Sequence, residues 1–120
     1  MENVLNIVKQ VNDLIDEKIW VDFCVSEIKQ NRVKIEGAID FSWDDKFVEL
    51  IFEEADYVRI ILYEWTKKEN CPVLEILDRA KSKEQFGVVP LDDNDIIFKL
   101  NVDNGEPILI FAKKFCYKLL

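Results

Sequence analysis

Asp95 to Tyr117 reads Asp-Ile-Ile-Phe-Lys-Leu-Asn-Val-Asp-Asn-Gly-Glu-Pro-Ile-Leu-Ile-Phe-Ala-Lys-Lys-Phe-Cys-Tyr, and this stretch decides the fold. Asn104-Gly105 between two apolar runs predicts a two-residue β-hairpin, because a type I′ turn needs positive φ at both central residues. A two-residue turn also fixes the register, which places Phe98 opposite Phe111 on an apolar face. The same register pairs Leu100 with Leu109 and Val102 with Pro107.

Residues 2–18, at the other end of the chain, show the 3.6-residue periodicity of an amphipathic helix. The apolar stripe consists of Val4, Val8, Val11 and Ile15. The opposite, solvent-exposed side of the helix is expected to carry Lys9, Gln10, Asn12, Asp13, Asp16 and Glu17. Such a stripe usually packs against a sheet, so the helix is predicted to cover the strands that follow.

From Trp20 the apolar period changes from 3.6 to 2, which predicts a β-rich region over residues 20–118. Turns are expected at residues 30–32 and 54–56, and Gly37 predicts a bulge or bend within a strand. The predicted strands begin at Trp20 and then cover residues 33–41, 47–53 and 57–65, with a short one at 86–89.

Two stretches of this region leave alternatives open. Residues 72–80 can be a helix that starts at Pro72 or a fifth strand, and we favour the strand narrowly. The strand at residues 57–65 has one face formed by Tyr57, Arg59, Ile61, Tyr63 and Trp65. That face is expected to be a second packed layer, and the alternative is an exposed recognition surface.

The predicted fold is therefore α+β, in a single domain over residues 1–120. An N-terminal amphipathic helix packs on a mainly antiparallel β-meander of about six or seven strands, because the connections between successive strands are short.

The residue types that are missing exclude most catalytic chemistry. The chain has no histidine, which removes the commonest general base and transition-metal ligand. Its three cysteines are far apart, and its three glycines form no phosphate-binding loop. We therefore expect no catalytic residues, no cofactor and no metal site. The run Asp92-Asp93-Asn94-Asp95 lacks the order of a calcium loop and is interpreted as a turn that enters a strand.

Compartment and partners follow from charge and hydropathy. No apolar run is long enough to span a bilayer, and the first residues do not resemble a signal peptide. Unpaired cysteines fit a reducing cytoplasm. A net charge of −8 argues against nucleic acid as a partner, because phosphate contacts need a basic surface.

The negative charge is concentrated in one segment. Residues 36–56 contain eight acids and one base, so they hold −7 of the −8. Acids on turns and sheet faces keep small domains soluble, but a negative patch also attracts a basic protein partner. The candidate partner-binding residues are Trp43, Asp44, Asp45, Glu53, Glu54 and Asp56. Trp43 is an aromatic anchor in this hypothesis and a core residue in the alternative.

Several features together resemble a group of small bacterial proteins. They are a strand near Trp20, a hairpin over Ile28 to Ile35, the Trp43-Asp44-Asp45 turn, and the Gly105-Glu106 turn before a final strand. The group includes immunity proteins of polymorphic toxin systems, which the resemblance implies as an expectation. Many of those proteins carry His-Asp near the first strand where this chain has Val21-Asp22, so no site residue is carried over.

The leading hypothesis is a non-catalytic, acidic binding protein of the cytoplasm, an immunity-type inhibitor of a basic toxin domain. The alternative is an accessory or structural protein that forms homo-oligomers through a sheet face. A small enzyme that uses carboxylates is the least favoured hypothesis.

Overall fold

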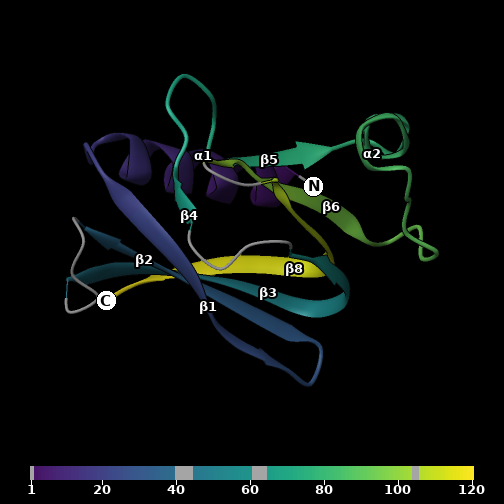
Figure 1. The fold of residues 1–120 in the computed structure, drawn as a ribbon. Helices are drawn as coiled ribbons and strands as arrows, with labels where there is room; N and C mark the ends of the chain where they lie inside the picture. The colour runs from purple at the N-terminus through teal and green to yellow at the C-terminus, as the bar shows by residue number, and fades with distance from the viewer. Residues whose placement is uncertain (1, 40–44, 61–64, 104–105) are drawn as a thin grey trace.

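The computed structural model describes residues 2–39, 45–60, 65–103 and 106–120, which form helices and strands in one α+β unit (Figure 1). The helices are α1 (Glu2–Asp16) and α2 (Arg79–Phe86). The strands are β1 (Val21–Lys29), β2 (Arg32–Ile39), β3 (Lys46–Arg59), β4 (Trp65–Lys67), β5 (Leu74–Leu77), β6 (Ile96–Leu100), β7 (Val102–Asp103) and β8 (Ile108–Leu119). The predicted fold class is confirmed: an N-terminal helix packs on an antiparallel sheet, here of eight strands.

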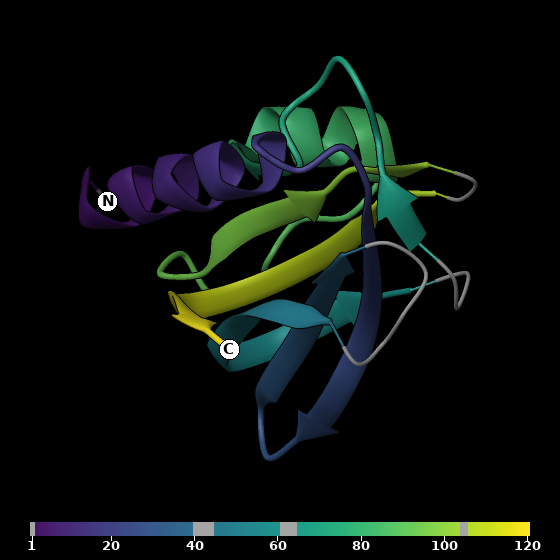
Figure 2. The same ribbon diagram turned by 90° about the vertical axis from the view of Figure 1, so that its left-hand side faces the viewer.

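The strand order is β5-β6-β8-β3-β2-β1-β4-β7, and every paired neighbour runs antiparallel. β1, β2 and β3 form the expected meander, whereas β8 lies between β6 and β3. β6 and β7 lie near opposite ends of this order, yet only Asn101 separates them in the chain. The sheet therefore curls until its two ends meet on one extended segment, with α1 lying over the curled sheet (Figure 2).

The apolar stripe of α1 fills the interior of this curled sheet. Val8, Val11 and Ile15 are buried and join core residues from β1, β2, β3, β5, β6, β7 and β8. At the end of the helix, the Lys67 ammonium donates hydrogen bonds to the carbonyls of Ile15 and Lys18. A cation at a helix C-terminus satisfies carbonyls that have no partner within the helix. The helix ends at Asp16, two residues before the predicted end.

Asn12 was predicted to lie on the solvent-exposed side of the helix. Its side chain instead binds the backbone of β5. Its amide donates to the Leu74 carbonyl at 2.8 Å, and its oxygen accepts from the Leu74 N–H at 2.8 Å. This pair of bonds imitates a strand neighbour, so α1 covers an outer edge of the sheet that would otherwise present free backbone groups. Residue type alone does not distinguish such an asparagine from a solvated one.

The C-terminal strand pair forms as predicted, but its register is shifted by one residue. Phe98 pairs with Ile110, and Ile97 pairs with Phe111. The predicted partners were Phe98 with Phe111 and Leu100 with Leu109; Leu100 instead pairs with Ile108. A one-residue shift moves each partner to the other face of the sheet. The Asn104-Gly105 turn lies outside the described residues.

Asn101 explains the shifted register, because the chain leaves the β6–β8 ladder at this residue. The Asn101 N–H donates to the Val73 carbonyl at 2.7 Å. Its side-chain amide donates to the Pro72 carbonyl at 2.9 Å and to the Glu75 carboxylate at 2.8 Å. Val102 and Asp103 then pair with β4. Because the chain is irregular at Asn101, counting residue pairs back from the predicted turn gives the wrong partner for Phe98.

The turn predicted at residues 54–56 is absent, because β3 continues through it to Arg59. Glu54 has a φ of 52°, and the register with β8 shifts between Ala55 and Tyr57. A bulge therefore replaces the turn, and it bends the strand without ending it. The predicted strand over residues 57–65 is wrong to that extent: residues 57–59 belong to β3, residues 61–64 lie outside the described part, and Trp65 begins β4.

Residues 72–80 contain the narrowly favoured strand, which is β5 over Leu74–Leu77. The sequence reading missed α2, however, and the short strand predicted at residues 86–89 does not form. Asp78 caps this helix by accepting from the Lys81 N–H at 2.7 Å, and Gly87 ends it with a φ of 72°. Aspartate is a preferred N-cap residue and glycine a preferred residue at the C-terminal end of a helix, so the sequence contained the signal for α2.

A second apolar cluster lies on the outer side of β6 and β8, where α2 covers it. Leu77, Ile97, Leu109 and Phe111 are buried there, against Tyr57, Phe86 and Val88. The ring of Tyr57 stacks on Phe111 with centroids 4.7 Å apart. For Tyr57, the interpretation as a second packed layer is therefore confirmed.

The irregularity predicted at Gly37 is also confirmed. The register between β2 and β3 shifts between Gly37 and Ala38. A Cβ atom at Gly37 would lie 2.9 Å from a methyl group of Val48, so only glycine allows the two strands to approach this closely.

Candidate functional site

The structure does not bring all the predicted partner-binding residues together. Trp43 and Asp44 lie outside the described residues. Asp45 precedes β3, whereas Glu53, Glu54 and Asp56 lie in its second half. Asp45 directly precedes the start of β3 and Asp56 lies near its end, and an extended strand of that length spans roughly 36 Å at about 3.3 Å per residue. The described candidates therefore belong to two separate regions of the surface.

Lysines of β8 also reduce the negative field that the acidic segment was expected to produce. Lys114 lies 3.6 Å from the Glu54 carboxylate and opposite Glu53 in the register, and Lys118 is opposite Glu49. On β2, Glu36 forms an ion pair of 2.9 Å with Lys46. The segment with a charge of −7 is therefore not one uncompensated patch.

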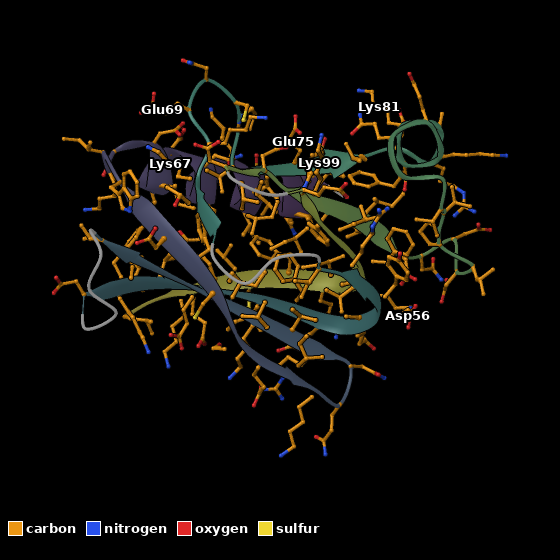
Figure 3. All side chains as sticks on the ribbon, viewed as in Figure 1. Asp56, Lys67, Glu69, Glu75, Lys81 and Lys99 are labelled. Carbon is orange, nitrogen blue, oxygen red and sulfur yellow. The ribbon has the colours of Figure 1, made fainter. Side chains whose placement is uncertain are left out.

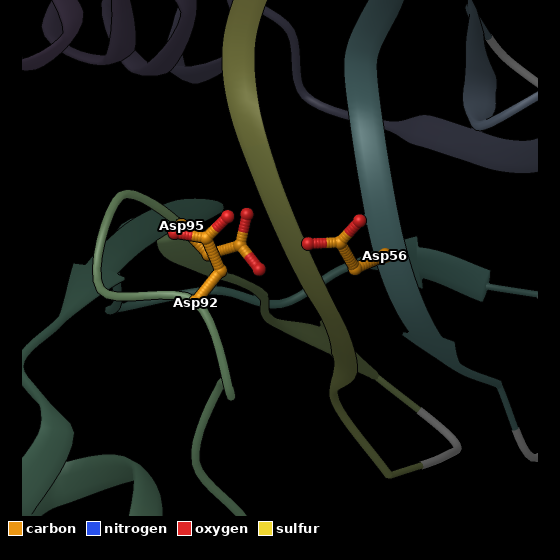
Figure 4. A group of neighbouring side chains, drawn as sticks. All are labelled: Asp56, Asp92 and Asp95. Carbon is orange, nitrogen blue, oxygen red and sulfur yellow. The ribbon is translucent and has the colours of Figure 1, made fainter.

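The largest concentration of carboxylates surrounds Lys113 of β8. Its ammonium lies 3.1 Å from Asp56, 3.1 Å from Asp92 and 2.8 Å from Asp95. Asp92 and Asp95 belong to residues 90–95, which we call the acidic loop and which leads from α2 to β6. Figure 4 shows these two side chains next to each other and Asp56 facing them from β3. We refer to Lys113, Asp56, Asp92 and Asp95 as the Lys113 cluster.

Asp95 is the buried member of the cluster, since only 1% of its side chain is exposed, compared with 46% for Asp56 and 41% for Asp92. Burial, followed by a hydrogen bond with Asp56, raises the pKa of Asp95. The hydrogen bond with Asp95, followed by that with Lys113, lowers the pKa of Asp56. The last proton of this pair therefore resides on Asp95.

The other two members of the cluster remain charged. A hydrogen bond from the Asn94 N–H, followed by one from Lys113, lowers the pKa of Asp92. Hydrogen bonds with Asp95, Asp56 and Asp92 raise the pKa of Lys113. With all carboxylates ionised, three negative charges surround one positive charge, so the cluster retains an excess of negative charge.

The chemistry open to this cluster is limited. Carboxylate oxygens of Asp56, Asp92 and Asp95 lie within 4.8 Å of one another, a spacing that suits an oxygen-seeking cation such as Ca²⁺ or Mg²⁺. The Lys113 ammonium lies among the same oxygens and would repel such an ion. Its raised pKa also makes Lys113 a poor nucleophile or general base. The cluster is suited to holding the acidic loop against β3 and β8.

The interpretation of residues 92–95 as a turn that enters a strand is confirmed. The Asp92 side chain accepts from the Asn94 N–H at 2.8 Å, and the Asp95 N–H donates to the Asp92 carbonyl at 3.1 Å. β6 begins directly afterwards at Ile96. The sequence did not predict that Lys113 of β8 binds this turn and holds it next to β3.

Ionisable side chains elsewhere in the described residues are spread over several places, and one group of them lines an open hollow of about 350 Å³ formed by Asp16, Glu17, Lys18, Ile19, Lys67, Lys68, Glu69, Asn70 and Cys71. Figure 3 shows Lys67 and Glu69 near α1, Glu75 beside Lys99, and Lys81 and Asp56 well apart from them. An open groove of about 630 Å³ lies between α1 and the β4–β5 connection. Its walls are Leu5, Val8, Lys9, Asn12, Asp16, Asn70, Cys71 and Pro72. The Cys71 thiol in its wall donates a hydrogen bond to the Lys68 backbone carbonyl at 3.9 Å.

No family model, curated protein or solved structure matches this chain. The resemblance to immunity proteins therefore rests on the sequence features quoted above. Neither helix in the described part of the chain is long and apolar enough to cross a membrane.

Proposed function

We propose that this chain is a non-catalytic, acidic binding protein, an immunity-type inhibitor that associates with a basic toxin domain. The observation that carries the proposal is the Lys113 cluster, in which three carboxylates surround one ammonium and hold the acidic loop against β3 and β8. An excess of fixed negative charge accelerates association with a basic surface by orders of magnitude and makes it sensitive to salt.

Other features support a binding role over catalysis. The sequence contains no histidine, and the carboxylates of the cluster are already engaged by Lys113. The three cysteines are free thiols, which fits the reducing cytoplasm where we place the protein. The resemblance to immunity proteins of toxin systems supplies the class of partner.

The test uses the purified product of the gene adjacent to this one and the full chain, with association measured at low and high salt. Three double variants each remove two negative charges from a different place. Glu54→Gln with Asp93→Asn removes them beside the Lys113 cluster, where the two side chains are 54% and 95% exposed. Asp44→Asn with Asp45→Asn tests the turn predicted from the sequence, and Asp13→Asn with Glu17→Gln is the control at the C-terminal end of α1 and just after it.

We expect fast association at low salt, a steep decrease at high salt, and the largest loss of rate in the Glu54/Asp93 variant. Equal rates in all three variants would mean that only net charge matters and would remove the site from the proposal. No binding at either salt concentration would refute the inhibitor function.

A second function is favoured by one observation, the half-buried outer side of β2 and β3. Lys34, Glu36, Glu49 and Ile51 alternate there with core residues and are only half-buried. Charges of both signs on one face would complement a second copy arranged antiparallel, as expected for a self-associating accessory protein. Light scattering after size-exclusion chromatography tests this directly, since a monomer at high concentration would exclude it.

A further inference from the structure

Leu91, in the acidic loop, is the most exposed large apolar side chain among the described residues. Its relative exposure is 104%, whereas the preceding Pro90 is buried. Single exposed leucines are common on protein surfaces, so exposure alone indicates no function. The residues on both sides of Leu91, however, are held in place by side chains of other elements.

Side chains from two other elements fix the acidic loop on either side of Leu91. Before it, Arg79 of α2 donates to the Pro90 carbonyl at 2.8 Å. After it, Arg79 lies 3.7 Å from Asp93, and Lys113 of β8 binds Asp92 and Asp95. Leu91 is therefore presented on a loop that is already ordered, and association does not require the entropy loss of ordering that loop.

The charges around Leu91 define the surface that would accept it. Asp92 and Asp93 follow it directly, with 41% and 95% of their side chains exposed, and Asp56 lies across the cluster at 46%. An exposed apolar side chain followed by two exposed carboxylates, one of them paired with Arg79, is complementary to an apolar pocket with lysine or arginine at its rim. Binding energy concentrates in a few buried residues near the centre of an interface, while charges at the rim mainly set the association rate.

We propose that Leu91 is the anchor of the interface, and that it inserts into an apolar pocket rimmed by basic residues on the partner. This inference rests on the proposed function and adds to it the residue that determines how long the complex lasts. It also separates two roles that neighbouring residues play: the carboxylates speed association, and Leu91 slows dissociation.

The experiment compares dissociation rates of four proteins from the purified adjacent-gene product: the unchanged chain, Leu91→Ala, Leu91→Met and Ile19→Ala. Burial of a leucine side chain corresponds to roughly a tenfold to hundredfold change in Kd, so Leu91→Ala should dissociate faster by about that factor. Leu91→Met keeps the apolar volume and should stay within about threefold of the unchanged chain. Ile19 lies three residues after the end of α1, is 93% exposed and serves as the matched control.

Thermal melting of each variant checks that the fold is retained, which we expect because neither Leu91 nor Ile19 is buried. If Leu91→Ala and Ile19→Ala both dissociate as slowly as the unchanged chain, the anchor role is wrong, while salt-dependent association would still support the inhibitor function. If the unchanged chain does not bind, the inhibitor function fails, and the anchor role fails with it.

Discussion

Replacing Asn12 by alanine should destabilise the protein far more than a change on a polar helix face normally does. The substitution removes both 2.8 Å hydrogen bonds between Asn12 and the backbone of Leu74. Leu74 is only 1% exposed, so its N–H and carbonyl would lose their partners in a largely buried position. The site therefore belongs to the class of substitutions that leave buried polar groups unsatisfied.

The magnitude follows from the two groups involved. Each buried backbone group left unpaired costs about 1–3 kcal/mol, and water entering from the open groove beside Asn12 should keep the sum near 2–3 kcal/mol. The better helix propensity of alanine offsets about 0.5 kcal/mol. We expect a net decrease of about 2 kcal/mol in the free energy of unfolding, which lowers Tm by roughly 6–12 °C for a domain of this size.

Urea denaturation and thermal melting of the Asn12→Ala variant measure this loss directly. Asp13→Ala is the matched control, because it gains similar helix propensity one residue away, where the side chain is exposed. Asn12→Asp keeps an acceptor for the Leu74 N–H but places a charged oxygen against the Leu74 carbonyl, so it should be at least as harmful. If Asn12→Ala is as stable as Asp13→Ala, the two bonds contribute no more than water does, and the role assigned to Asn12 is wrong.

Phe98→Ala should cost about 3–5 kcal/mol, because the ring is fully buried with its centroid 5.1 Å from Phe52 and 5.4 Å from Phe115; a urea midpoint close to that of the unchanged protein would contradict this. Lys113→Met should lower Tm at neutral pH and less so at acidic pH, and melting between neutral and acidic pH measures the difference. The pKa values of Asp56 and Asp92 are lowered in the folded state. The stability that these two carboxylates contribute is therefore present above the ordinary pKa of 3.8 and is lost as the pH falls through their folded pKa. The raised pKa of Asp95 has the opposite effect on the pH dependence. Lys114→Met is the control, since Lys114 is 70% exposed and 3.6 Å from Glu54; a pH-independent loss in the Lys113 variant would contradict the assignment.

The elements that the sequence predicts well are those governed by local periodicity. The stripe of Val8, Val11 and Ile15 identifies α1, and the alternation around Gly37 identifies β2 together with its bulge. α2 was missed because its eight residues have no apolar stripe, and only the caps at Asp78 and Gly87 mark it. A search for helix-capping residues would have predicted a helix between Asp78 and Gly87.

Long-range pairing is the part that local patterns do not contain. The hairpin register depends on Asn101, whose partners are residues 72, 73 and 75. The Lys113 cluster likewise joins residues 56, 92, 95 and 113, and neither charge nor spacing in the sequence indicates that these meet. Of the predicted binding residues, Asp56 alone among the described ones belongs to this cluster.

The position of β8 between β6 and β3 has a consequence for how the protein is made. β8 is the last strand in chain order, yet β3 pairs with it over almost its whole length, from Val48 to Arg59. While the ribosome is still synthesising β8, β3 presents an unpaired apolar edge that can join another nascent chain. The bulge at Glu54 interrupts that edge and limits the length available for wrong pairing. Protein synthesis, as well as final stability, therefore gives a reason for this irregularity in the longest strand.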